Sequence, residues 1–547
     1  MSGNKRNFFT DWIRSGPDRT SLIILIITNF VCNNIFLFNL KYYADDWPFF
    51  VYPGPKTVSY ALLDSQRPLS SAYLVLQQYL TYNVVLFHVL TFVTTTIALV
   101  LIYFVFKRIF QDCGFENELY PFIGAMFFCT LFNKDQIYAW PIMSLGLEFN
   151  ATLLSIYLYL NKEKKYYLIV SMIAYFTALL GYELGVLIPV IFFLYDYLMG
   201  KDWKKSVYFA IPLGLYLTIR YTKWFGYGYV SVDRGFGSWN LGIIINSFQY
   251  PIITCQVFLN NLFNSVYGYA QMDIALIAAL CIINIVLLFI IYRHLKTFTV
   301  SKNMNIKLVY VAILMIIAFW APYIIAGWDS LPTRGFYLCD IGIALLLVCI
   351  LMVFKGYVNI KILALGIIVL GIFVNQGLYY NWVVCGDTLG KIDHFLEGNS
   401  DKLIQYDYVY FNTLSFTDIK PEKYPWATLV MSKFKKARNA LFGPPARPDK
   451  QYDYGYATYF NALALPRPAL EVMIKEQRKT ADYTLIYGHV PTGKPDKRKG
   501  AVPIDVTKDN ITYKLVNSGK ISTVSRDKVF EINYSSVVGS DQSSSAI

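Results

Sequence analysis

Two adjacent carboxylates, Asp45 and Asp46, stand near the start of the chain in the stretch 42–48 (YYADDWP). They directly follow the uncharged run Ser21–Leu40, which is 20 residues long. Carboxylates at the edge of an apolar segment are costly unless they meet water, a cation or another partner. They could serve as a general base or as ligands of a divalent cation, and Trp47 beside them could stack on a sugar ring. A solvated loop or helix cap, with Trp47 in an interfacial aromatic belt, is the structural alternative.

Three further charged residues lie between or beside apolar runs. Arg67 stands in Gln-Arg-Pro-Leu-Ser, Asp135 in Asn-Lys-Asp-Gln, and Glu183 in Gly-Tyr-Glu-Leu-Gly. Arg67 could bind a phosphate or form an ion pair with the two aspartates. Glu183 is a candidate functional carboxylate because of its apolar flanks, with a helix-terminus carboxylate as the alternative. Glu148, near one end of an apolar run, is a weaker candidate of the same kind.

A late loop brings an arginine and a tyrosine together in Arg334-Gly-Phe-Tyr337, between two apolar runs. At headgroup depth, the guanidinium of Arg334 could hold a lipid phosphate through two parallel hydrogen bonds. It could equally extend to the lipid headgroups as an anchor. Asp273, which directly precedes an apolar run, is expected to be an N-terminal helix carboxylate.

The composition places the chain in a membrane. Of its 547 residues 55% are hydrophobic and only 16% are charged, against about 25% charged in soluble domains. A helix of roughly 20 apolar residues crosses the hydrocarbon core, and the pattern predicts about eleven such spans. They are expected at 21–40, 83–106, 119–133, 141–160, 166–181, 183–199, 206–222, 274–292, 308–328, 336–354 and 362–380.

Lysine and arginine concentrate in alternate loops, which predicts the orientation of the chain by the positive-inside rule. Residues 1–20 are then cytoplasmic, and the first loop, 41–82, lies outside. The segment Leu241–Tyr267 is apolar but broken by polar residues, and we expect it to lie at the outer interface rather than to span. An odd number of spans puts the C-terminus outside, and the localisation is a multi-pass cell (inner or plasma) membrane protein.

Charged residues and turn signals become frequent after residue 381. Strand-like runs at 406–411, 483–487, 511–516 and 529–534, with a helical run at 468–479, predict a small α+β domain over 381–547. The Ser-rich end, 535–547, is expected to be disordered. The fold class is therefore an all-α polytopic membrane domain, 21–380, followed by a soluble α+β domain outside the membrane.

Several other chemistries receive no support from the sequence. The eight cysteines have no metal-type spacing and mostly lie in or beside apolar runs, which is typical of small core residues. The four histidines are dispersed, and no phosphate-binding glycine loop or serine elbow is present. The net charge of +13 follows membrane topology, so nucleic acid is not an expected partner.

Order and spacing of these residues resemble the GT-C-type membrane glycosyltransferases. The closest likeness is to bacterial and phage glucosyltransferases that modify surface polysaccharide, such as lipopolysaccharide, in which a first-loop Asp-Asp-Trp precedes Gly-Arg-Pro-Leu. Here Gln66 replaces the glycine. Tyr182-Glu183 and Arg334-Gly-Phe-Tyr337 also resemble positions in multi-spanning O-mannosyltransferases. The resemblance covers roughly residues 1–380 and does not extend to the C-terminal domain.

The resemblance implies transfer of a monosaccharide from a polyprenyl-phosphate donor to a glycan or other surface acceptor, with inversion at the anomeric carbon. Asp45 would be the base and Asp46 its support or a cation ligand. No cofactor is certain. The resemblance also allows a divalent cation (Mg²⁺ or Mn²⁺) to be held by this pair. The residues expected to bind substrate are Trp47, Arg67, Asp135, Glu183, Arg334 and Tyr337.

Three other functions fit parts of the same pattern. A transporter or flippase of lipid-linked sugars would explain the spans and the outer arginine, and its transport activity should persist when Asp45 is replaced. A polysaccharide polymerase or ligase would depend on arginine-rich outer loops more than on an acidic pair. A non-catalytic assembly factor would need neither.

Overall fold

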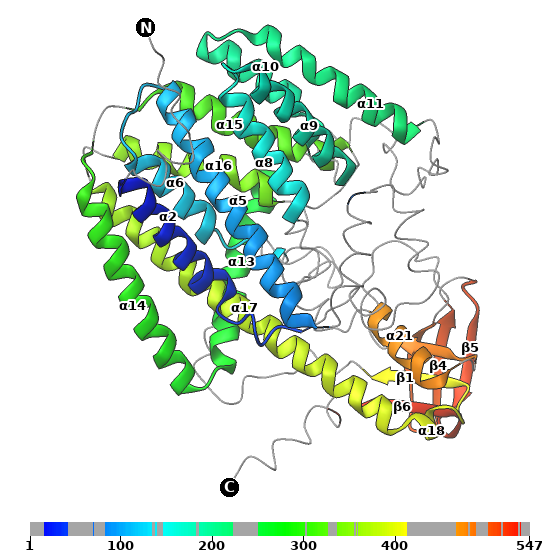
Figure 1. The fold of residues 1–547 in the computed structure, drawn as a ribbon. Helices are drawn as coiled ribbons and strands as arrows, with labels where there is room; N and C mark the ends of the chain where they lie inside the picture. Colours follow the sequence, from blue (N-terminus) through cyan, green and yellow to red (C-terminus); the bar gives the residue numbers. More distant parts are fainter. Residues whose placement is uncertain are drawn as a thin grey trace, which may run out of the picture. The chain divides into compact units, whose positions relative to one another are not determined.

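The computed structural model is mostly helical and ends in a small mixed sheet (Figure 1). The residues it describes are 16–41, 69, 83–133, 137–138, 146–181, 185–221, 250–300, 304–325, 336–354, 357, 359–412, 467–479, 482–487, 501–515, 518–533 and 537. Two compact units make up the chain. The helical unit takes in Met1–Phe38, Val58–Phe258 and Met272–Tyr379, and the C-terminal unit takes in Asn39–Thr57, Leu259–Gln271 and Tyr380–Ile547.

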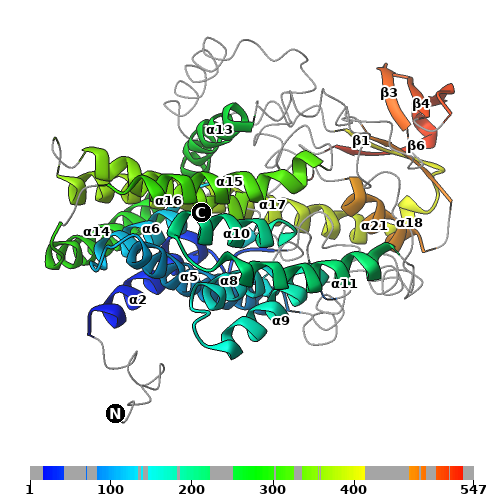
Figure 2. The ribbon, with the colours of Figure 1, turned by 90° about the horizontal axis from the view of Figure 1, so that it is seen from above.

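Most helices of the helical unit lie roughly along one common direction (Figure 2). They are α2 (Gly16–Asn29), α5 (Val84–Asp112), α6 (Leu119–Thr130), α8 (Gly146–Leu160), α9 (Lys165–Gly181), α10 (Ile188–Met199), α11 (Ala210–Tyr221), α14 (Ile274–Thr297), α15 (Ile306–Ile325) and α16 (Phe336–Val353). Two more helices, α13 (Tyr250–Gln271) and α17 (Ile360–Gly398), contribute to both units.

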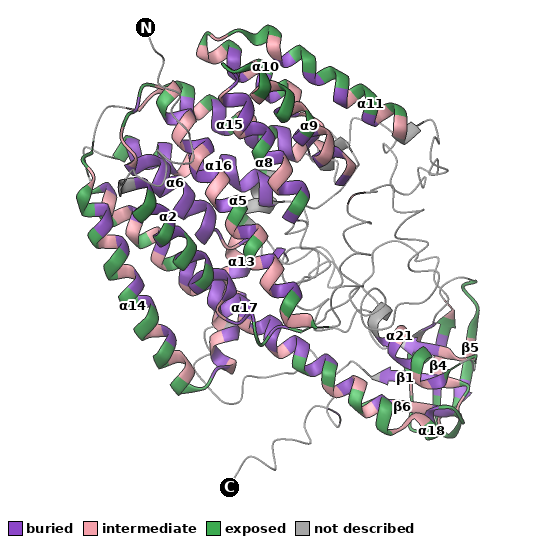
Figure 3. Cartoon of the chain, viewed as in Figure 1, coloured by how far each residue is buried: buried purple, intermediate pink, exposed green. Residues whose placement is uncertain are grey.

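Among the residues that the structure describes, three helices, α5, α14 and α17, are long and apolar enough to cross a membrane, and five shorter apolar helices accompany them. The outer face of α14 is both apolar and exposed (Figure 3). Ile282, Ile285 and Phe289 are each more than 60% exposed, which is unfavourable in water and favourable in lipid. These features indicate a membrane protein.

A pair of asparagine side chains terminates α6 inside the helical unit. The carboxamide of Asn33 donates to the carbonyl of Cys129 at 3.0 Å, and that of Asn375 donates to the carbonyl of Thr130 at 3.2 Å. The last carbonyls of a helix have no partner within the helix, and lipid offers none. The asparagines supply the missing donors, so the helix can end after only 12 residues.

The first helix changes to a π-helical turn, η1 (Phe30–Asn34), after Asn29. The π geometry opens the regular ladder, and Gln376 donates to the carbonyl of Val31 at 3.1 Å. Gln376 also exchanges hydrogen bonds of 3.0 Å and 2.8 Å with Asn284. These buried amides join η1, α14 and α17 and restrain the register of the three elements.

The C-terminal unit is built on a six-stranded sheet with the order β5-β4-β3-β2-β1-β6. The strands are β1 (Tyr408–Asn412), β2 (Thr484–Tyr487), β3 (Ala501–Val506), β4 (Asn510–Leu515), β5 (Ile521–Ser525) and β6 (Val529–Asn533). Strands β3, β2, β1 and β6 run parallel to one another, and β4 runs antiparallel to both of its neighbours, β3 and β5. Helix α21 (Arg467–Arg478) connects β1 to β2 along the chain, as parallel neighbours require.

The sequence predicted this architecture in part. Four strands and the helix of the C-terminal unit are present close to their predicted bounds, whereas β3 and β5 were not predicted. The C-terminal unit begins its last and longest segment at Tyr380, beside the predicted domain start at residue 381, and α17 runs across this boundary to Gly398. The expected eleven spans stay a prediction beyond the three long helices. Segment 535–547 lies outside the described residues apart from Val537.

Candidate functional site

Most of the predicted site residues lie outside the described residues. These are Asp45, Asp46, Trp47, Arg67, Asp135, Glu183 and Arg334. Tyr337 is described, and it stands in the first turn of α16, three residues after Arg334. Around Tyr337 lie the helix ends that lead into the segments carrying Asp135 and Arg334. The structure therefore defines the surroundings of the candidate site through these helix ends.

Tyr337 is almost completely buried among aromatic side chains. Its ring centroid lies 4.8 Å from that of Phe149 on α8 and 5.3 Å from that of Phe128 on α6, and its hydroxyl forms a hydrogen bond with Tyr138. Because the ring contacts side chains from two other helices, its position is set by packing. A direct contact of this ring with substrate stays a prediction.

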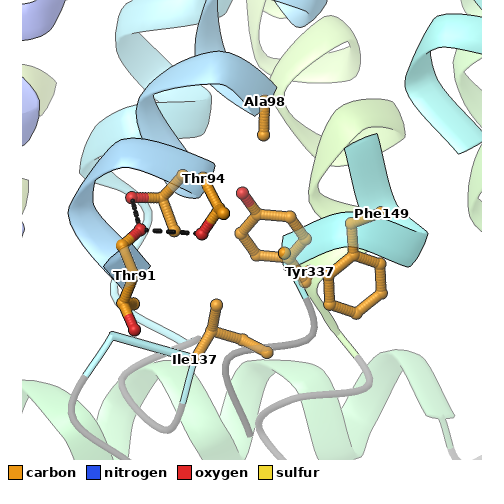
Figure 4. Close-up of a pocket in the computed structure, with 8 residues that line it drawn as sticks. Thr91, Thr94, Ala98, Ile137, Phe149 and Tyr337 are labelled. Atoms are coloured by element: carbon orange, nitrogen blue, oxygen red, sulfur yellow. Dashed lines mark hydrogen bonds between the residues drawn. The ribbon is translucent and has the colours of Figure 1, made fainter. Parts of the chain in front are cut away.

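Beside Tyr337 the helices enclose a small cavity of about 10 Å³, roughly the least that holds one water molecule. Three threonines of α5 line it, Thr91, Thr94 and Thr95, together with Gly146, Phe149 and other side chains. Figure 4 shows the hydroxyl of Tyr337 directed toward the threonines. The cavity is too small for a sugar, so within the described residues it is a packing feature with a hydroxyl lining.

A carboxyl group that sequence reasoning missed lies on α16, one turn after Tyr337. Asp340 is fully buried, and Asn133 donates to its Oδ1 atom through Nδ2 at 2.7 Å. Asn133 is also fully buried and follows α6 by three residues. A lone aspartate inside an apolar helix is a functional signal in a membrane protein. The run Leu-Cys-Asp-Ile-Gly carries that signal in the sequence.

Glu148 is a second buried carboxyl, in the first turn of α8. It packs directly on the end of α9. A Cβ atom at Gly181 would lie 1.8 Å from the Cγ atom of Glu148, so only glycine leaves room for this side chain. Gly181 precedes Glu183 by two residues, and the contact therefore holds the end of α9 beside the start of α8.

These residues define what we call the Tyr337 end of the helical unit, namely Asn133, Glu148, Tyr337 and Asp340. A different arrangement, which we call the basic end, lies at the other ends of the same helices. Thr94 and Lys107 are 13 residues apart on α5, which corresponds to about 20 Å along the helix. The two ends can therefore be compared within one unit.

At the basic end, three aspartates each accept hydrogen bonds from a tyrosine and a lysine. Asp18 pairs with Tyr103 at 2.6 Å and with Lys107 at 2.7 Å. Asp112 pairs with Tyr195 and with Lys201, both at 2.5 Å. Asp196 pairs with Tyr159 at 2.5 Å and with Lys162.

The three clusters join the ends of different helices and leave little charge uncompensated. Lys107 also binds Glu118 at 2.8 Å, and Arg108 binds Glu163 at 2.6 Å. Burial lowers the pKa of Lys162, and its hydrogen bond to Asp196 opposes that shift. Such compensated clusters are typical of structural anchors rather than of reactive sites.

Within the described ranges, no three His, Cys, Asp or Glu side chains gather in a group that could hold a metal ion. The two aspartates that the sequence offers as cation ligands, Asp45 and Asp46, stand outside those ranges. No protein-family model and no curated protein matches this chain. The function is therefore argued from the residues themselves.

Proposed function

We propose that this chain is a membrane glycosyltransferase. It moves a monosaccharide from a polyprenyl-phosphate donor to a glycan or other surface acceptor, and it inverts the anomeric configuration. The donor and acceptor meet at the outer face of the membrane. Asp45 is the base that accepts the proton of the acceptor hydroxyl, and Asp46 supports it or holds a cation.

The observation that carries this proposal is the contrast in chemistry between the ends of the helical unit. The Tyr337 end holds two buried carboxyl groups, Glu148 and Asp340, where an apolar segment would be cheaper. The helix ends there lead into the segments that contain Asp135, Glu183 and Arg334. The basic end instead compensates its carboxylates with lysines.

The reaction itself explains why acids and cations are needed together. Breaking the bond between the anomeric carbon and the phosphate oxygen adds negative charge to the lipid phosphate. A guanidinium such as that of Arg334 stabilises the developing charge. The acceptor hydroxyl becomes a better nucleophile when a carboxylate takes its proton. A single displacement inverts the configuration, so a second carboxylate acting as nucleophile is not required.

The test is a reconstituted assay with purified protein in liposomes. A panel of polyprenyl-phosphate sugars is supplied with candidate glycan acceptors, and release of polyprenyl phosphate and the anomeric configuration of the product are measured. We expect transfer by the wild type and its loss in Asp45→Asn, with donor binding retained. Asp273→Asn, the same chemical change directly before α14, is the matched control and should keep transfer.

Two outcomes would overturn the proposal. If the wild type moves the labelled lipid across the bilayer without breaking the sugar–phosphate bond, the protein is a transporter. If Asp45→Asn turns over at the wild-type rate, Asp45 is not the base. Equal losses in Asp45→Asn and Asp273→Asn would point to misfolding rather than chemistry, and a thermal unfolding curve of each variant distinguishes the two.

A further inference from the structure

Asp340 and Asn133 form a buried polar pair among apolar helices, where burying a polar group costs free energy. Both side chains are almost inaccessible, at 0% exposure. Asp340 lies within the 18-residue apolar helix α16. The nitrogen–oxygen distance of 2.7 Å is at the short end of the range for N–H···O hydrogen bonds. An apolar pair of the same size would pack at least as well there.

The pair joins two helix ends that are far apart in the sequence. Asn133 follows the end of α6, and Asp340 lies one turn inside the start of α16, so 207 residues separate them along the chain. The rings of Phe128 and Tyr337 make a second contact between the same helices, at 5.3 Å. The two contacts together leave little freedom for one helix end to slide against the other.

The orientation of the Asn133 carboxamide is fixed by this contact. Its nitrogen is directed to Asp340, so the assignment of nitrogen and oxygen is determined by the partner. Its Oδ1 atom is buried and accepts no hydrogen bond in the described part of the chain. A group that only filled space would not need a polar atom placed in this way.

From this arrangement we propose that Asp340, acting through Asn133, is a positioning residue of the transferase site. The pair holds the end of α6 against the start of α16. It thereby fixes, relative to each other, the points where the segments containing Asp135 and Arg334 are attached. The inference rests on the proposed function, because Asp135 is a predicted substrate ligand and Arg334 the predicted phosphate-binding cation of that reaction.

The experiment compares three variants of this pair with one control. Asp340→Leu removes the acceptor, Asn133→Leu removes the donor, and Asp340→Asn keeps an acceptor oxygen without the charge. The control is Asn284→Leu, because Asn284 is an equally buried amide that binds Gln376 at 2.8 Å in the same unit. Each protein is assayed for transfer and for thermal unfolding.

Asp340→Leu and Asn133→Leu should each lower kcat roughly 100-fold, the cost of a displacement of about 1 Å at a reacting centre. Asp340→Asn should stay within about fivefold of wild type because the hydrogen bond is retained. The double variant should be no worse than either single variant, because both remove the same contact. Asn284→Leu should lower the melting temperature by a similar amount and leave kcat nearly unchanged.

Hydrogen–deuterium exchange of the full-length protein gives a readout that does not depend on turnover. Asp340→Leu and Asn133→Leu should speed exchange in peptides covering residues 131–138 and 326–340, and Asn284→Leu should not. If the wild type transfers no sugar, the proposed function fails, and this exchange pattern alone decides whether the pair positions the two segments. If exchange rises equally in all variants, or if the control loses kcat in proportion to its stability, the positioning role is wrong.

Discussion

The two ends of the helical unit differ in the partners that their buried carboxyl groups have. At the basic end, Asp18, Asp112 and Asp196 each meet a lysine and a tyrosine hydroxyl. At the Tyr337 end, Asp340 accepts a hydrogen bond from a neutral carboxamide. The same helices, α5, α6 and α8, run from one environment to the other.

This difference in partners distinguishes carboxyl groups that anchor helix ends from carboxyl groups that could take part in a reaction. A carboxylate that is matched by a cation and a hydroxyl has its charge compensated, and it can hold helix ends together. The carboxyl of Asp340 accepts its hydrogen bond from the amide of Asn133 instead of from a lysine. The basic end thus holds compensated ion pairs, and the proposed function would put its site at the Tyr337 end; the predictions below test that division.

The sharpest test asks whether the two ends face opposite sides of the membrane. A cysteine at position 334 should react with an impermeant thiol reagent added outside intact cells, and a cysteine at position 164 should not. The effect is all-or-none. The control is the wild type, because the native Cys255 is exposed in the structure and sets the background. Labelling of position 334 from the cytoplasm would break the comparison and would indicate that Leu241–Tyr267 spans.

A second test removes one member of a compensated cluster. Asp196→Ala should lower the free energy of unfolding by about 3–5 kcal/mol, because it leaves the buried charge of Lys162 without this partner. The double variant Asp196→Ala/Lys162→Met should recover much of that loss. Thermal or denaturant unfolding in detergent measures both. Transfer by the folded fraction should be unchanged, and a selective loss of donor binding would mean that the basic end takes part in the reaction.

A third test removes the predicted phosphate ligand. Arg334→Ala should cost about 2–4 kcal/mol of transition-state stabilisation, or roughly 30- to 1,000-fold in rate. Arg334→Lys should restore only part of the lost rate, because lysine keeps the charge but cannot form the two parallel hydrogen bonds. Steady-state kinetics with varied lipid donor measures both. Wild-type kcat and KM in both variants would make Arg334 a headgroup anchor and Arg67 the next candidate.

The helices could be predicted because their apolar runs are long. Every expected span that falls in the described ranges is matched by a helix, since such runs have few alternatives in lipid. The ends were less predictable. The sequence placed the end of the last span at residue 380, whereas α17 continues to Gly398, because a helix can leave the membrane without any break in its backbone pattern.

The candidate site was only partly predictable for a related physical reason. Loop acids such as Asp45 stand out because charge follows an apolar run. Asp340 was missed although it lies in an apolar run, since one aspartate barely changes the hydropathy of α16, and its partner Asn133 is 207 residues away. The contact between Gly181 and Glu148 also depends on packing. Strands β3 and β5 were missed because Pro503 interrupts the first and Ser and Thr dominate the second.

The smallest effect concerns the tyrosine hydroxyls of the anchoring clusters, and the C-terminal unit offers a matched comparison. Tyr159→Phe removes a hydroxyl that donates to Asp196 at 2.5 Å. It should destabilise the protein by about 1.5–3 kcal/mol, the range for hydrogen bonds to charged groups. Tyr410 on β1 is equally buried, but its hydroxyl has no hydrogen-bond partner among the described residues. Tyr410→Phe should therefore be neutral or stabilising by about 1 kcal/mol.

The pH dependence of stability adds a second readout for Tyr410. Burial, assisted by the charge of Glu531, raises the pKa of Tyr410 above its usual value of 10.0. The folded state then keeps the proton where the unfolded state loses it, so this stability is present below pH 10 and is lost as the pH rises above it. Wild type should lose more unfolding free energy than Tyr410→Phe between pH 9 and about 11. Two results would contradict this comparison of Tyr159 with Tyr410. One is an equal loss of unfolding free energy with pH in wild type and Tyr410→Phe. The other is a Tyr410→Phe variant as unstable as Tyr159→Phe, which would show that the Tyr410 hydroxyl has a partner.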